Sequence, residues 1–328
     1  MSNKIRFPAI ICDIDGLLIR GIHLIPRVLE TFQALRQKPL NILYKSNVFP
    51  LNKQLPLVLL TNGGVTLPEK KLFKYNQTFS LEIDFHKLKS ENLVLNYSPL
   101  TEDLQEKKRD LWLITGMGEI SEIARYCGFS HTITLDSLMK KRQNSINQES
   151  YRSFLKEITG VLVLDDLVSW DHNLVIILDL LSIHSIEKFP IVLVHNDKFY
   201  PDEFPLPRMC LGVFNRVLAN FALKIYGKKP NLIFYGKPTL RTFEYTKQFV
   251  RKNWQDYEIS RFYMLGDNPD TDILGGNKGG METVLVKTGV YNDSNKEQFG
   301  GEDSKAKFIV EDFKEAIDLI AEKEGFYL

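Results

Sequence analysis

Short hydrophobic runs, each followed by a polar or glycine-rich turn, recur in both the first and the last third of the chain. A run that is apolar on both faces is typical of a parallel strand buried inside a sheet. The runs that we expect to form one sheet are Ala9–Cys12, Leu57–Leu60, Leu232–Tyr235, Arg261–Leu265 and Thr283–Lys287. Helical patterns follow at Arg27–Arg36 and Asp312–Lys323. Strands separated by helices predict an α/β fold with a parallel, doubly wound sheet.

A long segment between the two halves has strand and helix patterns of its own. We expect these elements at Leu111–Thr115, Gly160–Leu164, Asn173–His184 and Ile191–Val194. They predict a second α/β domain, residues 82–207, inserted into a discontinuous core formed by residues 1–81 and 208–328. The segment Gln37–Pro56 is rich in Pro, Asn and Lys and is expected to be a surface loop.

The composition is that of an ordinary globular protein, with 44% hydrophobic and 25% charged residues and a net charge of +1. This balance gives no reason to expect nucleic acid or a membrane surface as a partner. The three cysteines and six histidines show no spacing typical of metal ligands or of a disulfide framework. The first strand begins near Phe7, which leaves no room for a cleavable targeting peptide, so we expect a cytoplasmic protein.

Two acidic residues directly follow the first strand, in Asp13-Ile14-Asp15-Gly16. Residues two apart on an extended segment point to the same side, and ligands of open α/β sheets bind where strands end. Adjacent carboxylates repel each other unless a cation, a proton or hydrogen bonds compensate them. Mg²⁺ prefers oxygen ligands and is the simplest such cation.

The other strand-end turns supply what phosphoryl transfer needs. We predict Asp13 as the nucleophile, because a carboxylate can attack phosphorus and divide one difficult step into two. Asp15 would protonate the leaving oxygen and then deprotonate the attacking water. The groups expected to bind phosphate or metal come from the later turns, namely Thr61 and Asn62 as hydrogen-bond donors, Lys237 as a fixed positive charge and Asp267 as a further Mg²⁺ ligand.

These turns together resemble the four motifs of the haloacid dehalogenase superfamily, which has a Rossmann-like core. The matching stretches are Asp13-Ile14-Asp15-Gly16, Thr61-Asn62, Gly236-Lys237-Pro238 and Gly266-Asp267-Asn268-Pro269-Asp270-Thr271-Asp272. A large insert between the second and third motifs is similar to the class IIA capped branch, which includes p-nitrophenyl-phosphatase-like enzymes. The resemblance implies a Mg²⁺-dependent phosphatase that forms an aspartyl-phosphate.

The resemblance also implies roles for single residues. Metal contacts are assigned to the Asp13 carboxylate, the Asp15 main-chain carbonyl and Asp267, with Asp272 supporting the site. Family dehalogenases lack an acid at the position of Asp15, so halide chemistry is not expected. The residues expected to contact the substrate are Gly16, Thr61, Asn62 and Asn196.

Class IIA caps usually carry Asn-x-Asp after their last strand, whereas this chain has His195-Asn196-Asp197-Lys198, with the acid one place early. Asn196 is expected to keep the contact with substrate, and a structural role is favoured for His195. Trp170 with the following LVIILDLL, and the later VKTGVYND, most resemble the cat-eye-syndrome-critical-region-5-like subgroup. Members of that subgroup are often mitochondrial, which is the alternative to a cytoplasmic location, and caps of this branch often mediate homodimers.

The function that we predict is hydrolysis of a small phosphorylated metabolite. Two alternatives remain open: a catalytically idle relative that binds a phosphorylated ligand or partner, and a phosphomutase that moves phosphate within a sugar. The altered acid in the inserted domain favours the idle alternative, and the complete set of core residues favours an enzyme.

Overall fold

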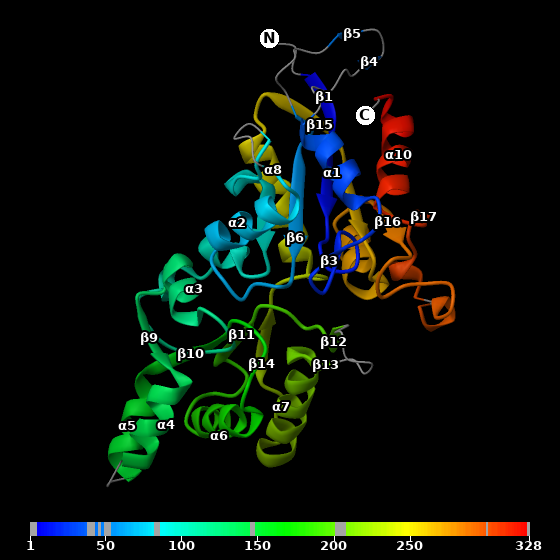
Figure 1. The fold of residues 1–328 in the computed structure, drawn as a ribbon. Helices are drawn as coiled ribbons and strands as arrows, with labels where there is room; N and C mark the ends of the chain where they lie inside the picture. The colour runs from blue at the N-terminus through cyan, green and yellow to red at the C-terminus, as the bar shows by residue number, and fades with distance from the viewer. Residues whose placement is uncertain are drawn as a thin grey trace. The chain divides into compact units, whose positions relative to one another are not determined.

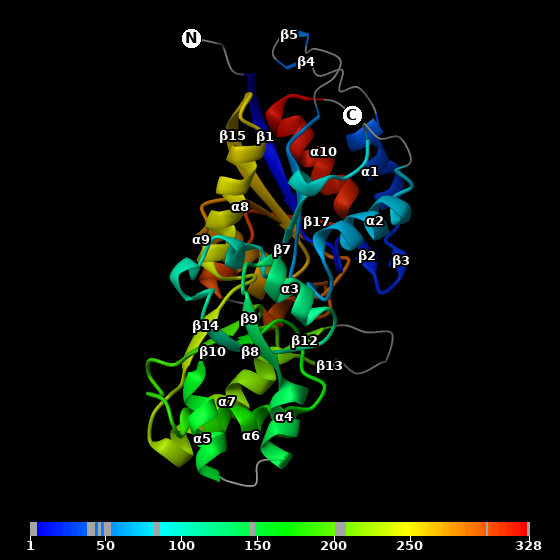
Figure 2. The same cartoon turned by 90° about the vertical axis from the view of Figure 1, so that its left-hand side faces the viewer.

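The chain forms two compact units in a computed structural model that describes residues 5–37, 43–44, 47–48, 54–81, 86–144, 148–200, 208–299 and 301–326. Unit 1 consists of residues 1–61, 68–94 and 237–328, and unit 2 of residues 62–67 and 95–236. Figure 1 and Figure 2 show the elements of each unit.

Unit 1 is built on a six-stranded sheet with the order β17-β16-β15-β1-β6-β7. The strands are β1 (Ile5–Cys12), β6 (Leu57–Thr61), β7 (Leu93–Leu95), β15 (Tyr257–Gly266), β16 (Glu282–Val286) and β17 (Phe308–Val310). Strand β1 runs parallel to both β15 and β6, and β16 runs parallel to β15 and β17. The predicted parallel α/β sheet is confirmed.

Helices of unit 1 cover both faces of this sheet, with α8 on one face and α1 and α10 on the other (Figure 2). Phe243 and Val250 of α8 pack in one buried cluster with Ala9 and Ile11 of β1. The helices are α1 (Val28–Gln37), α2 (Pro68–Thr78), α8 (Leu240–Asn253), α9 (Leu274–Lys278) and α10 (Phe313–Glu324). Unit 1 also contains two short antiparallel pairs, β2 (Ile19–Arg20) with β3 (His23–Leu24) and β4 (Leu43–Tyr44) with β5 (Asn47–Val48).

Unit 2 has a five-stranded parallel sheet with the order β14-β11-β10-β8-β9. Its strands are β8 (Leu111–Thr115), β9 (His131–Thr134), β10 (Ile158–Val163), β11 (Pro190–Leu193) and β14 (Asn231–Phe234). Its helices are α3 (Ile120–Tyr126), α4 (Leu135–Asn144), α5 (Gln148–Glu157), α6 (Trp170–Leu181) and α7 (Leu211–Tyr226). A short antiparallel pair joins β12 (Phe199–Tyr200) and β13 (Arg208–Met209).

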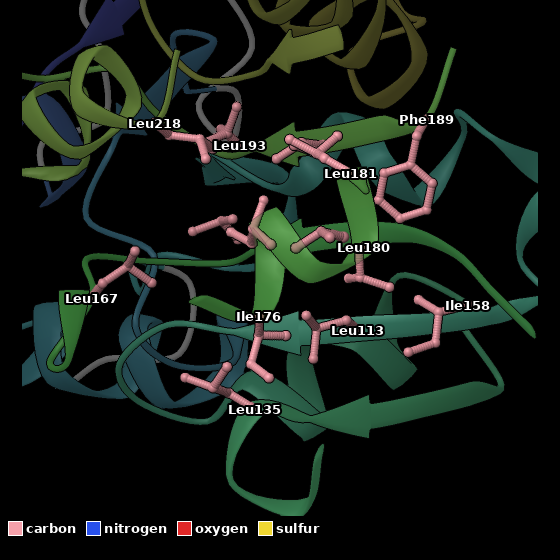
Figure 3. Packing of buried hydrophobic residues seen from close by; sticks show 14 of the residues in the cluster. Leu113, Leu135, Ile158, Leu167, Ile176, Leu180, Leu181, Phe189, Leu193 and Leu218 are labelled. Carbon is pink, nitrogen blue, oxygen red and sulfur yellow. The ribbon is translucent and has the colours of Figure 1, made fainter. Parts of the chain in front are cut away.

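The core of unit 2 lies between its sheet and the apolar faces of its helices (Figure 3). Ile176 and Leu180 on α6, and Phe214 and Leu218 on α7, recur at the spacing of one helical face and are fully buried. Gly227, with φ of 69°, ends α7 in the left-handed conformation that glycine adopts without a steric penalty. The predicted second α/β unit therefore has a hydrophobic core of its own.

One strand lies in a different sheet from the one that the sequence predicts. We expected Leu232–Tyr235 in the main sheet, but β14 pairs with β11 in unit 2, and Leu232 and Phe234 pack against the unit 2 core. A hydrophobic run indicates that a strand is buried but does not say which partner strand it has. Unit 2 consequently extends to residue 236 rather than ending near 207.

Several predicted boundaries fall on parts of the chain outside the described residues. The expected domain limits adjoin residues 82–85 and 201–207, which are outside that set. Most of the expected surface loop Gln37–Pro56 is outside it as well.

We expect Phe214→Ala to destabilise the protein by about 3–5 kcal/mol, because truncation of a buried aromatic side chain leaves a cavity in the unit 2 core. Phe221 lies on the same helix and is 50% exposed, so Phe221→Ala should change the free energy of unfolding by no more than about 0.5 kcal/mol. Urea unfolding of both variants measures the difference. Equal losses in the two variants would contradict this assignment of the core.

Candidate active site

The first two acidic groups of the site follow neighbouring parallel strands. Asp13 comes directly after β1 and Asp267 directly after β15, and the register pairs Cys12 with Leu265 near these ends. The Asp13 amide donates a hydrogen bond to the Leu265 carbonyl, with 2.9 Å between N and O. The sheet itself therefore places the two side chains next to each other, as the sequence predicts.

Asp272 joins them from the single helical turn Pro269–Ile273 that follows β15. This turn is closed by the Asn268 amide, which donates to Asp272 Oδ2 at 3.1 Å. One carboxylate oxygen from each of Asp13, Asp267 and Asp272 lies within 4.8 Å of the others. We call these three residues, together with Lys237, the acidic site.

Lys237 lies between two of these carboxylates. Its Nζ donates to Asp13 Oδ1 at 2.5 Å and to Asp272 Oδ1 at 2.7 Å. The preceding strand β14 belongs to unit 2, whereas Lys237 itself belongs to unit 1 with its partners. The predicted convergence of Lys237 with Asp13 thus occurs within one compact unit.

The acidic site is buried and carries more negative than positive charge. Asp13 is 7% exposed, Lys237 3%, Asp267 2% and Asp272 0%. If all four groups are ionised, three carboxylates face one ammonium and the sum is −2. Burial disfavours uncompensated charge, so this excess must be met by protons or by a cation.

The pKa values of the groups in the acidic site reflect their burial and the excess of negative charge. Burial raises the pKa of the Asp13 carboxyl well above its ordinary value, and Lys237 opposes the rise only in part. Burial and the neighbouring Asp272 raise the pKa of Asp267 to about 7. Burial lowers the pKa of the Lys237 ammonium, but Asp13 and Asp272 outweigh this effect and raise it above its ordinary value. Lys237 therefore stays charged, and its single ammonium compensates only part of the negative charge of the three carboxylates.

Three glycines allow the backbone to approach the acidic carboxylates closely. A Cβ on Gly16 or on Gly289 would lie 2.2 Å or 1.9 Å from Asp267 Oδ2, and one on Gly266 would lie 2.2 Å from Asp272 Oδ2. Gly16 also has φ of 91°. Gly16 is among the predicted substrate contacts, whereas Gly266, the last residue of β15, and Gly289, in the loop after β16, have no predicted role of their own.

The loop after β16 also holds Asp267. The Val290 amide donates to Asp267 Oδ2 at 2.5 Å, and the Tyr291 amide donates to the Asp267 carbonyl at 3.0 Å. Thr288 Oγ1 donates to the Gly16 carbonyl at 2.6 Å and so connects this loop to the one after β1. The contribution of Val290 is not predictable from the sequence, because a backbone amide leaves no residue-type signal.

Asp15 differs from the buried acids because its side chain is exposed to solvent. Despite this exposure, surrounding protein atoms desolvate the carboxyl enough to raise its pKa, and the nearby ammonium groups of Lys71, Lys237 and Lys74 oppose the rise. A solvent-accessible carboxyl with a raised pKa is suited to donating and accepting protons.

The remaining predicted substrate contacts are divided between the two units. Thr61 is the last residue of β6 and is buried in unit 1. Asn62 belongs to unit 2, where its Nδ2 donates to Asp197 Oδ2 at 2.9 Å. Asn196 also belongs to unit 2, is exposed, and its Oδ1 accepts from Asn215 Nδ2 at 3.2 Å.

The donor set of the acidic site fits a hard divalent cation. Carboxylate oxygens are the ligands that such ions prefer, and three of them are grouped within 4.8 Å. The glycines leave space that a Cβ would fill, and burial disfavours the ionised forms of Asp13 and Asp267 unless a positive charge compensates them.

Two family models match large parts of the chain. Residues 10–130 match the family described as haloacid dehalogenase-like hydrolase, and residues 234–316 match the family described as HAD-hydrolase-like. These ranges contain every residue of the acidic site.

Among curated proteins, the chain is 26% identical to a cardiolipin synthase (CMP-forming)/mitochondrial hydrolase fusion protein of Schizosaccharomyces pombe. This similarity covers 88% of the chain but only 49% of the fusion protein, so the chain spans about half the length of that relative. The word mitochondrial in that name describes the relative. A cytoplasmic location for this chain stays a prediction. No helix within the described residues has the length and apolar character needed to cross a membrane.

Solved structures share the fold at low sequence identity. A possible sugar phosphatase from Cytophaga hutchinsonii is 21% identical, with a TM-score of 0.67 over 93% of this chain and 94% of that one. A glycerol phosphate phosphatase from Mycobacterium tuberculosis in complex with magnesium is 16% identical, with a TM-score of 0.63 over 93% of this chain and 76% of that one. The predicted fold is confirmed by both similarities.

We expect Gly289→Ala to weaken Mg²⁺ binding about 10-fold or more, because the added methyl group would displace the Asp267 carboxylate. Isothermal titration with Mg²⁺ measures the effect. Gly301→Ala is the matched control, since its new Cβ would meet only Ser304 at an ordinary 3.6 Å. Unchanged Mg²⁺ affinity in Gly289→Ala would contradict the role of Asp267 as a ligand.

Without divalent cations, the protein should lose stability as the pH rises from about 4 to about 7. Asp267 has a pKa of about 7 in the folded protein against 3.8 in an ordinary environment, so between these values the folded state holds a proton that the unfolded chain has released. The contribution of Asp267 is at most about 1.4 kcal/mol per pH unit. Urea unfolding with a chelator measures this slope.

Two comparisons isolate the cause of that pH dependence. Asp267→Asn should reduce the slope, and saturating Mg²⁺ should stabilise the wild type more at pH 8 than at pH 5 because the ion competes with protons. A slope that is the same in Asp267→Asn and in the wild type would disprove the assignment.

Proposed function

We propose that this chain, which belongs to the haloacid dehalogenase-like hydrolases, is a Mg²⁺-dependent phosphatase that hydrolyses small phosphomonoesters. The observation that carries the proposal is the meeting of Asp13 with Lys237, Asp267 and Asp272 in one buried site of unit 1. The phosphatases among the similar structures support this reaction class.

In the first step, a carboxylate oxygen of Asp13 attacks the phosphorus atom of the substrate. The bond from phosphorus to the ester oxygen breaks, and Asp15 gives its proton to the departing alcohol. Lys237 donates to Asp13 Oδ1, which orients the carboxylate and favours its ionised form. The product of this step is a phosphate group carried on Asp13 as an acyl phosphate.

In the second step, water attacks the same phosphorus atom. Asp15, now deprotonated, accepts a proton from this water, the bond between Asp13 and phosphorus breaks, and inorganic phosphate leaves. The raised pKa of Asp15 suits this exchange, because the group must hold a proton in one step and lack it in the next. Exposure of Asp15 to solvent agrees with a group that meets both the leaving alcohol and the water.

Mg²⁺ would be held by the carboxylates of Asp13 and Asp267 and by the Asp15 main-chain carbonyl, with Asp272 supporting the site. When bound, the ion supplies positive charge for the phosphate oxygens and the buried carboxylates. Lys237 and Asp272 form the ion pair that holds Asp13 in place beside it. The neighbour that contains magnesium supports a divalent ion in this fold.

Unit 2 is proposed to act as a cap that restricts the reaction to small substrates. Asn62 and Asn196, both in this unit, are the residues proposed to contact the substrate there, while Thr61 of unit 1 would donate to a phosphate oxygen. A cap of this size, with its own five-stranded sheet, favours metabolites over phosphorylated proteins.

Asp13→Asn should abolish Mg²⁺-dependent hydrolysis of p-nitrophenyl phosphate, because the amide cannot form the acyl phosphate. The assay measures release of nitrophenolate with excess Mg²⁺. Asp318→Asn is the matched control, since Asp318 is an exposed acid on α10 that pairs with Lys314. Turnover by Asp13→Asn at the wild-type rate would refute the assignment of Asp13 as the nucleophile.

A panel of small phosphorylated metabolites separates this proposal from a binding protein without activity. Release of inorganic phosphate from at least one compound is the expected result. Thermal stabilisation by a compound, with no release of phosphate from any of them, would favour the binding protein.

A further inference from the structure

A second group of potential metal ligands lies entirely within unit 2. Strands β10 and β11 are parallel neighbours, and Val163 pairs with Leu193 where they end. Asp165 comes two residues after Val163, and His195 comes two residues after Leu193. Asp166 is next to Asp165. The sheet therefore brings their side chains to one edge, as it does for Asp13 and Asp267 in unit 1.

The three side chains are close enough to share one ion. One ligand atom from each of Asp165, Asp166 and His195 lies within 4.8 Å of the others. His195 Nε2 is 3.6 Å from Asp166 Oδ1, which is longer than an ordinary hydrogen bond. Two ligands of a tetrahedral ion with bonds of about 2.1 Å are separated by about 3.4 Å, so the observed spacing suits a bridging metal better than a direct contact.

The His195 side chain contains a buried polar atom that is unsatisfied, which is independent evidence for a ligand near this ring. Its residue is only 5% exposed, and Nδ1 is a buried atom with no hydrogen-bond partner among the described residues. Buried polar atoms in folded proteins are almost always satisfied, so each exception requires an explanation. Nδ1 faces Asp197 Oδ2 at 3.6 Å, and an ion bound at Nε2 would fix the ring so that Nδ1 can donate to this carboxylate, which would satisfy the buried atom.

Hydrogen bonds already hold the surrounding groups in place. The Leu211 amide donates to Asp166 Oδ1 at 2.5 Å, and the Asp166 amide donates to Asp165 Oδ1 at 2.7 Å. Asp197 Oδ2 lies 3.6 Å from His195 Nδ1 and accepts from Asn62 Nδ2 at 2.9 Å. A carboxylate behind the second ring nitrogen is the usual companion of a metal-binding histidine, because it fixes the tautomer of the ring.

The donor types indicate which ion would bind. Mg²⁺ selects oxygen ligands, whereas an imidazole together with carboxylates suits Zn²⁺ and similar transition ions. The acidic site of unit 1 has only carboxylates and an ammonium, so the two sites differ in the ion that they favour.

We propose that Asp165, Asp166 and His195 form a second metal site, for Zn²⁺ or a similar transition ion, with Nε2 of His195 as the nitrogen ligand. Asp197 accepts a hydrogen bond from Nδ1 when the ion is bound. The ion ties the ends of β10 and β11 to the start of α7 through Asp166 and Leu211. The inference does not depend on the reaction proposed for unit 1.

Zn²⁺ binding to the full-length protein tests this site, with excess Mg²⁺ present to occupy the acidic site. We expect the wild type to retain one Zn²⁺ per chain after dialysis. His195→Gln and Asp166→Asn should lose it, and Asp197→Ala should weaken the affinity by about 10–100-fold. His184→Gln is the matched control, because His184 lies in the same unit but bonds the Leu155 carbonyl at 3.0 Å.

Two results would overturn the site: a wild type that retains no Zn²⁺, or His195→Gln and Asp166→Asn proteins that retain it as the wild type does. Circular dichroism verifies that each variant is folded. X-ray absorption at the zinc edge of the wild type needs no variant and should show one imidazole among oxygen ligands. A shell without any nitrogen would place the ion elsewhere and would contradict the proposal.

Discussion

The contact of Lys237 with Asp13 and Asp272 is the interaction on which the site of this protein depends. Three buried carboxylates and one ammonium leave an excess of negative charge in a place where water is scarce. A buried ion pair recovers its cost of desolvation only when its geometry is good and further hydrogen bonds support it. Lys237 supplies one positive charge, and burial still raises the pKa of Asp13 well above its ordinary value. The remaining charge must therefore be met by protons or by a cation.

The fold produces this excess of negative charge by bringing acidic residues from neighbouring strand ends close together. Two neighbouring parallel strands, β1 and β15, end within one residue of each other in the register, which brings Asp13 and Asp267 to the same edge of the sheet. Glycines 16, 266 and 289 then let three loops close around the acids without steric conflict. Unit 2 repeats the arrangement, since β10 and β11 also end in register and carry Asp165 and His195. In both units the chemistry lies where the strands end, as expected for open α/β sheets.

Much of the parallel sheet and of the acidic site was predictable from the sequence, and the features that were not predictable have physical causes. Asp13 and Asp267 follow hydrophobic runs, and this local pattern was sufficient to place them together. The partner of β14 was not predictable, because pairing with β11 depends on contacts far apart in the chain. The contact of the Val290 amide was not predictable, because every residue except proline carries a backbone N–H and residue type gives no signal. His195 shows no ligand spacing in sequence, since its neighbours Asp165 and Asp166 are brought to it only by the sheet.

Carbon-13 NMR titration of the aspartate carboxyl groups tests the central claim most directly, since it measures the charge of each acid with and without Mg²⁺. In the metal-free protein, the pKa of Asp13 should be well above its ordinary value and that of Asp267 should be about 7. Saturating Mg²⁺ should bring both values down. Ordinary pKa values in the metal-free protein, or values that Mg²⁺ leaves unchanged, would contradict a site whose buried charge is completed by a divalent ion.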